Sequence, residues 1–490
     1  MVEKTIEELL KLIDSNEISA EKLVEESLEK AHKYQEKYNS FVTICDESKE
    51  LAKEDYSNTL FKGIPCAIKD NISTKGILTT ASSNILKDYI PFFDATSVSK
   101  LKEAGAINIG KTVLDELAMG GSSTTGHTGA VKNPWDSNRL IGGSSGGSAS
   151  AVALGIVPFA LGSDTGDSIR KPACYGGIVG YKPTYGLVSR FGLFAFASSL
   201  DHVGCFTRSV KDAALVIDAI KGKDQKDMTS LDSENINLYS SLTGDIKGKK
   251  LFYFKEMLDK ETYKDCSDDN LNQILDNFNE IIKKYESLGA TVTPINMDLK
   301  LLAAIFPTYF AISCAEATSN NSNLTGIIFG PRGEGESVDQ IMFDARTKGF
   351  SELIKRRFVL GSFILQRENQ EKLFLNAQRI RRLIVDKMNT LFADYDGLIL
   401  PASGDVAPKF KQDNENVNDK LSTRYLLLEN HLAIGNFGGF PSITIPCGTV
   451  EKMPIGLSIT CGVKKDADCL NIAYALEKEL PYKGQVAKEE

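Results

Sequence analysis

Two clusters of glycine and serine lie close together in the first half of the chain, at residues 142–148 (GGSSGGS) and 162–168 (GSDTGDS). Glycine-rich segments lose much conformational entropy on folding, so they usually mark a backbone that bends sharply or approaches a ligand. The apolar residues between the clusters favour a packed core over two flexible Gly/Ser linkers. We therefore expect a pocket built from backbone N–H groups and serine hydroxyls.

A nucleophilic serine needs a base, and the histidines of the chain offer no obvious one. The sequence has no HExxH motif and no G-x-S-x-G turn followed by a plausible histidine. The first glycine cluster does not end in Gly-Lys-Ser/Thr, which argues against a phosphate-binding loop. Lysine is the alternative base, as in Ser–Lys arrangements. The four histidines read as surface or core residues: His32, His127, His202 and His431.

Lys69 follows an apolar segment, residues 64–68 (IPCAI), and begins a polar turn, KDN. This pattern predicts a short buried strand with the lysine at its end. Burial lowers the pKa of a lysine, so that its amine can accept a proton near pH 7. A second serine could relay that proton. An ordinary surface lysine is the other interpretation of this position.

Strands and helices alternate around these residues, which predicts an α/β fold with a central mixed sheet covered by helices on both faces. Helix caps are predicted at Thr5 and Ser19, and residues 300–395 are mostly helical. Residues 409–423 form a polar segment that predicts a surface loop. Strands are predicted at residues 64–68, 106–109, 156–161, 250–254, 290–296, 442–446 and 456–461, and helices at 148–154, 266–287 and 466–480.

The absence of an internal repeat or linker favours one large domain over the 490 residues. Within it we expect a helical N-terminal arm (1–60), a catalytic core (61–220) and a third part (221–490). The third part would hold the remaining sheet, a helical region on the substrate side and the C-terminal strands.

Composition limits the classes of function. A net charge of −8 argues against a large nucleic-acid-binding surface. The nine cysteines are scattered without a CxxC pair, which indicates reduced thiols and no metal site. There is no run of about 18 apolar residues to span a membrane, and no signal peptide begins the chain. We therefore expect a cytoplasmic protein without a membrane segment.

The chain resembles the amidase signature family. Residues 142–173 are similar to the family pattern GGSSGGS…GSDTGGSIRxPA. In that family a lysine, a bridging serine and a nucleophilic serine carry out catalysis. The resemblance assigns these roles to Lys69 in AIKDN, Ser144 in GGSSGG and Ser168 in DSIR. It also implies the family's single large α/β domain.

Further segments narrow the resemblance to the A subunits of glutamyl-tRNA(Gln) amidotransferases, among them IGKTVLDELAMG, YKPTYGLVSRFGLFAFASSLDHVG and RRFVLGSF. Such a subunit hydrolyses glutamine and supplies ammonia within a heterotrimer that includes subunits B and C. A partner subunit uses ATP and Mg to amidate misacylated Glu-tRNA(Gln) or Asp-tRNA. The resemblance therefore implies no cofactor in this chain, with tRNA held mainly by the partner.

The resemblance implies nucleophilic catalysis in two steps. Neutral Lys69 takes a proton through Ser144 from Ser168, whose Oγ attacks the glutamine amide. Ammonia leaves, and water then hydrolyses the ester. The family's cis peptide would fall at Ser144–Ser145. The oxyanion would be stabilised by the backbone N–H groups of Thr165, Gly166, Asp167 and Ser168.

Asp167 departs from the family pattern, which has glycine before the nucleophile. Its backbone N–H remains available, so an oxyanion hole can still form. Its carboxylate would oppose the negative charge of an oxyanion unless it points away or pairs, for example with Arg170. Our hypothesis is that the chain retains activity with Asp167 in place.

Glutamine carries a carboxylate and an ammonium group, so its site needs a cation and an anion. The resemblance assigns the carboxylate to Arg357 and a place in the pocket to Tyr309. Glu429 falls where the family generally has aspartate, which would contact the ammonium group. From the residues alone, surface salt bridges are the favoured interpretation of Arg357 and Glu429.

Two other functions share these residues. A stand-alone amidase acting on another small amide would use the same three catalytic groups. A non-enzymatic scaffold could have lost activity through Asp167. Coupling of glutamine hydrolysis to partner subunits, and covalent trapping of Ser168, would separate these possibilities from an amidotransferase subunit.

Overall fold

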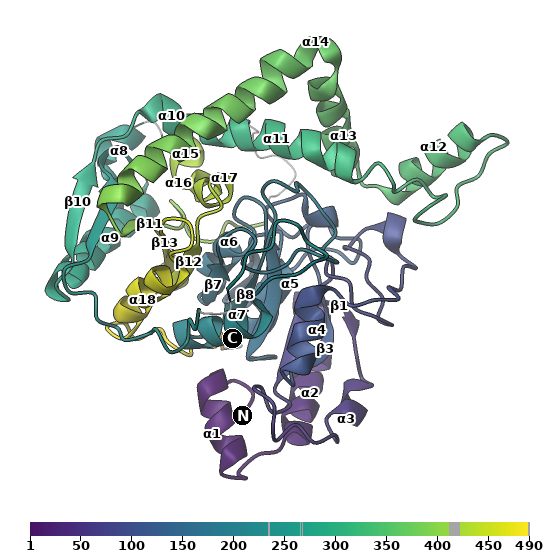
Figure 1. Ribbon diagram of the computed structural model, residues 1–490, viewed down its shortest axis with the longest axis horizontal. Helices are drawn as coiled ribbons and strands as arrows, with labels where there is room; N and C mark the ends of the chain where they lie inside the picture. The colour runs from purple at the N-terminus through teal and green to yellow at the C-terminus, as the bar shows by residue number, and fades with distance from the viewer. Residues whose placement is uncertain (234–235, 265, 267, 411–421, 489–490) are drawn as a thin grey trace.

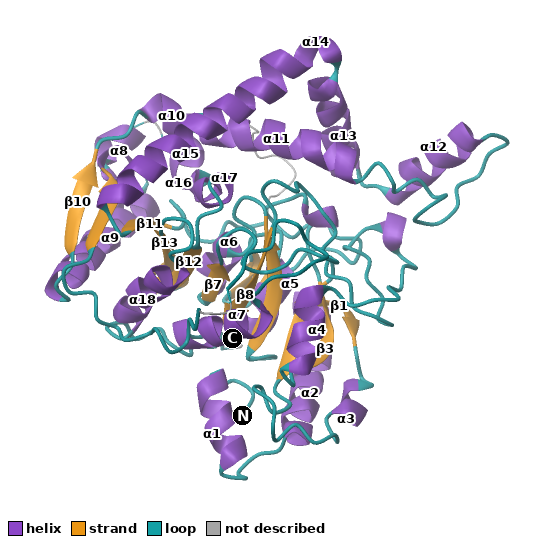
Figure 2. Ribbon diagram, viewed as in Figure 1, coloured by secondary structure: helices purple, strands orange, loops and turns teal. Residues whose placement is uncertain are grey.

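A mixed β-sheet organises the whole chain, in a computed structural model that describes residues 1–233, 236–264, 266, 268–410 and 422–488. The order of its 11 strands is β1-β3-β2-β6-β8-β7-β12-β13-β11-β9-β10. Helices lie on both sides of the strands (Figure 2). The predicted α/β class and mixed sheet are therefore confirmed.

The strands come from most of the chain length. They are β1 (Phe41–Ile44), β2 (Pro65–Lys69), β3 (Ile107–Thr112), β6 (Phe159–Asp164), β7 (Val179–Lys182), β8 (His202–Thr207), β9 (Lys250–Phe254), β10 (Thr291–Ile295), β11 (Gly397–Pro401), β12 (Ser442–Val450) and β13 (Met453–Thr460). A separate small hairpin consists of β4 (Lys132–Asn133) and β5 (Asp136–Leu140).

The helices fill the connections between the strands and form a second region after β10 (Figure 1). They are α1 (Ile6–Asp14), α2 (Ala20–Tyr38), α3 (Ser48–Leu51), α4 (Thr96–Glu103), α5 (Gly146–Ala153), α6 (Arg170–Gly176), α7 (Val210–Ile220), α8 (Lys255–Leu258), α9 (Asp269–Ser287), α10 (Leu299–Ala303), α11 (Ile305–Asn320), α12 (Val338–Gly349), α13 (Glu352–Leu365), α14 (Arg367–Gln370), α15 (Asn376–Asp394), α16 (Thr423–Leu428), α17 (Ile434–Phe437) and α18 (Asp466–Glu477).

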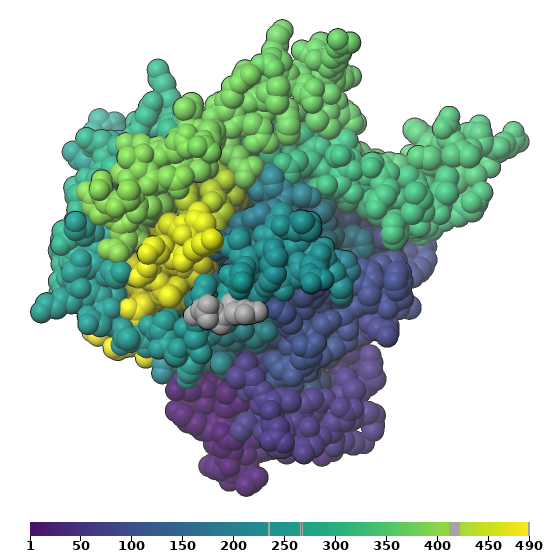
Figure 3. All heavy atoms as spheres, in the orientation of Figure 1, coloured from purple at the N-terminus to yellow at the C-terminus, as the bar shows by residue number. Residues whose placement is uncertain are grey.

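The two predicted N-terminal caps are present. Thr5 and Glu8 form a capping box at the start of α1, and the side chain of Ser19 accepts a hydrogen bond from the N–H of Lys22 at the start of α2. These helices lie at the lower end of the molecule in Figure 1, away from the helical region that follows β10. The space-filling view shows α12 projecting from that region (Figure 3).

The last hairpin differs in length from the prediction. Strands β12 and β13 extend to Val450 and from Met453, so only two residues connect them. Glu451 and Lys452 both have positive φ, at 50° and 64°. Two consecutive residues of this conformation form the tight hairpin turn that matches strand twist. The polar connection predicted after residue 446 is therefore mostly strand.

Residues 299–320 form a stretch that is long and apolar enough, by length and composition, to cross a membrane, which the sequence analysis overlooked. Most of it is α11, which packs against α13 and α15 within the fold. Of the surface loop predicted at 409–423, residues 411–421 lie outside the described residues.

Strands β2 and β6 place the first chemical groups of the site. They pair in parallel, with Cys66 opposite Phe159 and Ile68 opposite Leu161. Their carboxyl ends therefore meet at one edge of the sheet, where α/β proteins usually bind ligands. Lys69 ends β2, and Asp164 ends β6. The turn between β6 and α6 starts at this edge.

Candidate active site

Lys69 is buried at the end of β2, with no exposed surface. Its Nζ lies 2.8 Å from the Oγ of Ser144 and 2.8 Å from the Oγ of Ser163. A third contact, of 3.3 Å, joins Nζ to the backbone oxygen of Ser163. The interpretation of Lys69 as a surface residue is therefore wrong.

These contacts fit a neutral amine that acts as a base. A neutral lysine has two N–H donors and one lone pair. The backbone oxygen of Ser163 only accepts hydrogen bonds, and the Oγ of Ser163 can accept the second N–H. The Nδ2 of Asn71 lies 3.0 Å from that same Oγ and occupies its other side. The lone pair of Lys69 is then left for the hydroxyl proton of Ser144.

Burial also sets the charge of Lys69. It lowers the pKa of the amine from 10.5 to about 7, against the opposing effect of Asp115, Asp164 and Asp201. About half of the Lys69 side chains are neutral at a pH equal to that value. The physical condition for a Ser–Lys base, a lysine that releases its proton near neutral pH, is met.

The loop that carries Ser144 is held by Asp115. The N–H of Asp115 donates to the backbone oxygen of Ser144 at 3.1 Å. A Cβ on Gly143 would lie 2.2 Å from a carboxylate oxygen of Asp115, so this position accepts only glycine. The cis peptide bond lies at Gly143–Ser144. The expectation of a cis bond one position later, at Ser144–Ser145, is therefore wrong.

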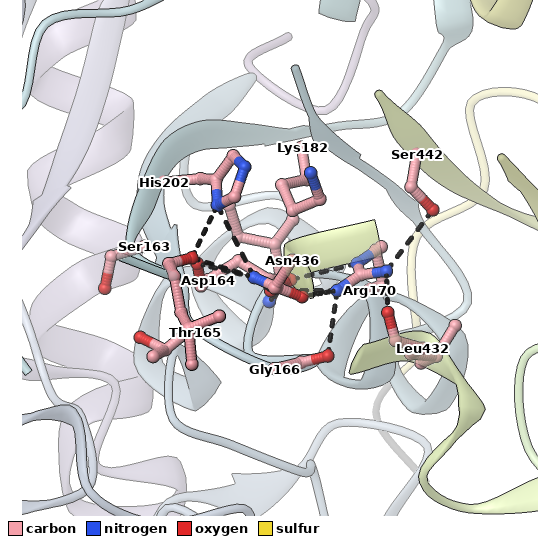
Figure 4. A network of polar contacts seen from close by, with 12 residues as sticks. Ser163, Asp164, Thr165, Gly166, Arg170, Lys182, His202, Leu432, Asn436 and Ser442 are labelled. Atoms are coloured by element: carbon pink, nitrogen blue, oxygen red, sulfur yellow. Dashed lines mark hydrogen bonds and ion pairs between the residues drawn. The ribbon is translucent and has the colours of Figure 1, made fainter. Parts of the chain in front are cut away.

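Arg170 holds the turn between β6 and α6 (Figure 4). Its guanidinium is fully buried and binds Asp164 through Nη2 at 2.9 Å and Nε at 3.1 Å. Nη2 also donates to the backbone oxygen of Gly166 at 2.9 Å. Burial raises the pKa of Asp164, but the neighbouring Arg170 outweighs it and holds the pKa below its ordinary value. The carboxylate is therefore ionised, and the turn is tied at both ends.

The C-terminal part of the chain completes this network. The Oδ1 of Asn436 accepts a hydrogen bond from Arg170 at 2.6 Å, and its Nδ2 donates to Asp164 at 2.9 Å. Arg170 also donates to the backbone oxygen of Leu432 at 2.6 Å. Every nitrogen of the guanidinium thus has a partner, as a buried charge requires.

The turn leaves its backbone donors free. Among the residues that the structure describes, the N–H groups of residues 165–168 donate no hydrogen bond. The side chain of Thr165 instead donates to Asp201 at 2.6 Å, which fixes the start of the turn. Free N–H groups in a rigid turn are the donors that an oxyanion hole needs. The four residues assigned to it, Thr165, Gly166, Asp167 and Ser168, therefore have the required backbone.

Ser168 lies beside the loop of Ser144 and is 4% exposed. Its backbone oxygen accepts a hydrogen bond from the N–H of Ser145 at 3.3 Å. Within the described part of the chain, its Oγ makes no hydrogen bond to Ser144. The structure thus joins Lys69 to Ser144 directly and places Ser168 next to them with a free hydroxyl.

Asp167 does not pair with Arg170, because that guanidinium is taken by Asp164. The pairing suggested from the sequence is therefore wrong. The carboxylate of Asp167 instead borders a cavity of about 1010 Å³. Burial raises its pKa to about 7, against the neighbouring charge of Lys171. The acid is therefore partly protonated at neutral pH.

The three residues assigned to substrate binding line this same cavity. Tyr309 on α11, Arg357 on α13 and Glu429 after α16 come from separate parts of the chain. The ring of Tyr309 also packs on Gly166, where a Cβ would lie 2.8 Å from it. Glu429 forms an ion pair of 2.6 Å with Lys171. All three line the cavity beside the turn that carries Ser168.

Several residues of this site were missed by the sequence analysis. Ser163 contacts Lys69, and Asn71 donates to Ser163. Asp115 holds the loop of Ser144, and Lys171 pairs with Glu429. Ser163 lies within the second Gly/Ser cluster, so its position could have indicated a role in the site. No pattern in the sequence indicated such a role for Asn71 or Asp115.

A buried lysine joined to a serine, beside a turn with free backbone donors and a second serine, defines an amidase-type site. The sequence profile of the family described as Amidase matches residues 22–470. The A subunit of the glutamyl-tRNA(Gln) amidotransferase of Streptococcus pneumoniae is 42% identical, over 98% of this chain and 97% of that protein. The protein of the same name from Enterococcus faecalis is 41% identical, over 98% and 96%.

A solved structure gives the same result. The glutamyl-tRNA(Gln) amidotransferase A subunit of Thermotoga maritima superposes with a TM-score of 0.81 at 36% identity, covering 100% of this chain and 99% of that one. The chain belongs to the amidase family and, within it, to the glutamyl-tRNA(Gln) amidotransferase A subunits. The resemblance noted in the sequence is thereby confirmed.

Proposed function

We propose that this chain is the glutamine-hydrolysing subunit of a glutamyl-tRNA(Gln) amidotransferase. One observation carries the proposal: the 2.8 Å contact between the buried Nζ of Lys69 and the Oγ of Ser144, beside Ser168. A lysine with a pKa near 7 supplies a base without histidine. The cavity next to Ser168 has the cation that an amino acid carboxylate needs, Arg357.

The reaction begins with glutamine in the cavity. The hydroxyl of Ser168 turns toward Ser144, and its proton passes to the Oγ of Ser144 as the proton of Ser144 passes to Lys69. The Oγ of Ser168 then bonds to the amide carbon of the glutamine side chain. The negative charge on the amide oxygen is stabilised by the free N–H groups of residues 165–168. Removal of one such donor typically raises the barrier by roughly 2.7–4 kcal/mol.

The second half of the reaction restores the enzyme. The proton on Lys69 returns through Ser144 to the amide nitrogen, the carbon–nitrogen bond breaks, and ammonia leaves. A glutamyl ester remains on Ser168. Water attacks this ester by the same proton path, which releases glutamate and returns the proton to Ser168.

The relatives' names, which call them A subunits of an amidotransferase, support a complex of more than one subunit. We expect a heterotrimer with subunits B and C, in which a partner binds Glu-tRNA(Gln) and uses ATP and Mg. The net charge of −8 fits a protein that does not itself hold most of the tRNA. The nine cysteines are all free thiols, which fits the cytoplasm.

The test is a coupled assay. The chain with subunits B and C should hydrolyse glutamine and amidate Glu-tRNA(Gln) with ATP, and its glutaminase rate should rise when ATP and Glu-tRNA(Gln) are added. A diazoketone analogue of glutamine should label Ser168, and the Ser168→Ala variant should not be labelled. Hydrolysis without any coupling would favour a stand-alone amidase. Absence of both labelling and hydrolysis would favour a scaffold without activity.

A further inference from the structure

Asp167 and Arg357, an acid and a base, both line the cavity and form no ion pair in the described part of the chain. In the described part of the chain, the carboxylate of Asp167 makes no hydrogen bond or ion pair with another residue. The Nη1 of Arg357 is buried and has no hydrogen-bond partner. The guanidinium lies 5.1 Å from the centre of the Phe310 ring, which supports its position but takes none of its hydrogen bonds. A buried donor without a partner is destabilising, so it points to a ligand.

Glu429, in contrast, is already satisfied. Its Oε2 accepts from the Nζ of Lys171 at 2.6 Å, and its Oε1 accepts from the Oγ of Ser403 at 2.9 Å and the N–H of Gly404 at 2.7 Å. Burial raises the pKa of Glu429, but Lys171 outweighs it and lowers the pKa. To bind Glu429, the ammonium group of a ligand would therefore have to displace the ammonium group of Lys171.

The remaining charged groups of the cavity are paired or exposed. Arg424 lies 3.5 Å from Asp405, and Glu352 pairs with Lys355 at 2.6 Å. Arg356 has no ion pair among the described residues, but it is exposed to solvent. Asp167 and Arg357 are thus the partly buried acid and base that remain available to the ammonium and carboxylate groups of a zwitterion.

We propose that Asp167, and not Glu429, binds the α-ammonium group of the substrate, while Arg357 binds its carboxylate. The inference rests on the proposed glutaminase function and concerns the recognition of glutamine in this chain. The ammonium group of Lys171 already binds the carboxylate of Glu429, where the ammonium group of a substrate would have to bind. The carboxylate that remains available to the substrate is that of Asp167, the residue before the nucleophile.

The position of Asp167 makes this geometry possible. Asp167 and Ser168 are adjacent, so their Cα atoms are about 3.8 Å apart. The amino group of glutamine is only a few bonds from the amide carbon that Ser168 attacks. A substrate bound at Ser168 therefore brings its ammonium group within reach of the Asp167 side chain.

The same position gives Asp167 a role in specificity. A carboxylate beside the oxyanion turn repels the negative charge that forms there, unless a cation neutralises it. The ammonium group of glutamine supplies that cation. An amide without an amino group does not, and its reaction is slowed by Asp167. The chain therefore selects α-amino acid amides both by binding and by the charge of the transition state.

The test compares glutamine with glutaramate, the same molecule without its amino group, on the full complex with subunits B and C. We expect Asp167→Asn to raise the KM for glutamine about 10- to 100-fold, because a charge-assisted contact is lost. With glutaramate the same variant should keep or increase kcat/KM. The preference for glutamine over glutaramate should therefore collapse.

Two further variants separate charge from structure. Asp167→Glu keeps the carboxylate and should retain part of the preference. Glu352→Gln removes one exposed carboxylate from the rim of the cavity and should leave the preference unchanged, as a matched control. Because an exchange at residue 167 could slow catalysis for other reasons, glutamine binding is also measured by calorimetry on a Ser168→Ala background. Asp167→Asn should weaken the binding of glutamine about tenfold or more.

Each outcome has one meaning. If the wild-type complex hydrolyses glutamine and Asp167→Asn retains its binding and preference, this inference is wrong and the proposed function stands. If the wild-type complex neither hydrolyses nor binds glutamine, the proposed function itself is wrong, and the inference falls with it.

Discussion

Lys69 and Ser144, 75 residues apart in the sequence, meet at 2.8 Å in the interior of the protein. The strand β2 brings the lysine to the edge of the sheet, and the glycine-rich loop before α5 brings the serine. Neither group could act alone, because a lysine in water stays protonated and a serine hydroxyl is a weak nucleophile.

The first prediction concerns Lys69 as the base. Lys69→Met keeps the length and apolar stem of the side chain and should lower kcat for glutamine by about 10³-fold or more, because the proton acceptor is lost. Lys69→Arg should be equally inactive, since a guanidinium keeps its proton. Steady-state glutaminase assays measure both, with thermal unfolding as the control for folding. Activity of Lys69→Arg near the wild-type level would contradict the assignment.

The second prediction concerns pH. Lys69 has a pKa of about 7, so below that pH it carries a proton and cannot accept another. We expect kcat to fall as pH decreases, by about tenfold per unit below pH 7. Asp167 has a similar pKa, so the pH profile is also measured on Asp167→Asn. The fall in kcat at low pH should remain in that variant. A kcat independent of pH between about 5.5 and 8 would exclude Lys69 as the base.

The third prediction concerns Ser163, which positions Lys69 without touching the substrate. Ser163→Ala removes one of the three contacts of the amine and leaves the backbone oxygen of residue 163 in place. We expect kcat to fall about tenfold with KM for glutamine unchanged, a smaller loss than the removal of a catalytic group. Ser144→Ala serves as the comparison and should lose far more. Equal losses in the two variants would mean that Ser163 takes part in proton transfer.

The fourth prediction concerns the ion pair beneath the oxyanion turn. Asp164 and Arg170 are both fully buried, so Asp164→Asn leaves a buried charge without its partner. This exchange should lower the free energy of unfolding by about 3–5 kcal/mol. Denaturant titration with two spectroscopic probes measures the change. The exposed pair of Lys283 and Glu280 gives the control, because Lys283→Met should leave the stability nearly unchanged.

Local sequence patterns predicted the fold class and many of its elements. The apolar run IPCAI is followed directly by Lys69, and β2 ends at that residue. The helix predicted at 148–154 is present as α5, two residues longer at its start. The strand expected from residue 156 begins only at Phe159, after Pro158, which has no N–H to give to a neighbouring strand.

Contacts between distant segments could not be predicted in the same way. Lys171 and Glu429 are 258 residues apart, and nothing in either local sequence indicates the other. The burial of Lys69 was expected from the strand before it, but its contact with Ser163 depends on the pairing of β2 with β6. Charge partners depend on three-dimensional packing, and for that reason Arg170 was paired with the wrong aspartate.

The network around Arg170 has a consequence for the synthesis of the protein. The turn that carries Ser168 is held in part by Leu432 and Asn436, which a ribosome adds long after Ser168 itself. A nascent chain that already contains Lys69, Ser144 and Ser168 therefore has an incomplete turn. The contacts that hold the turn are therefore complete only after residues 432–436 have been translated and have packed against Arg170.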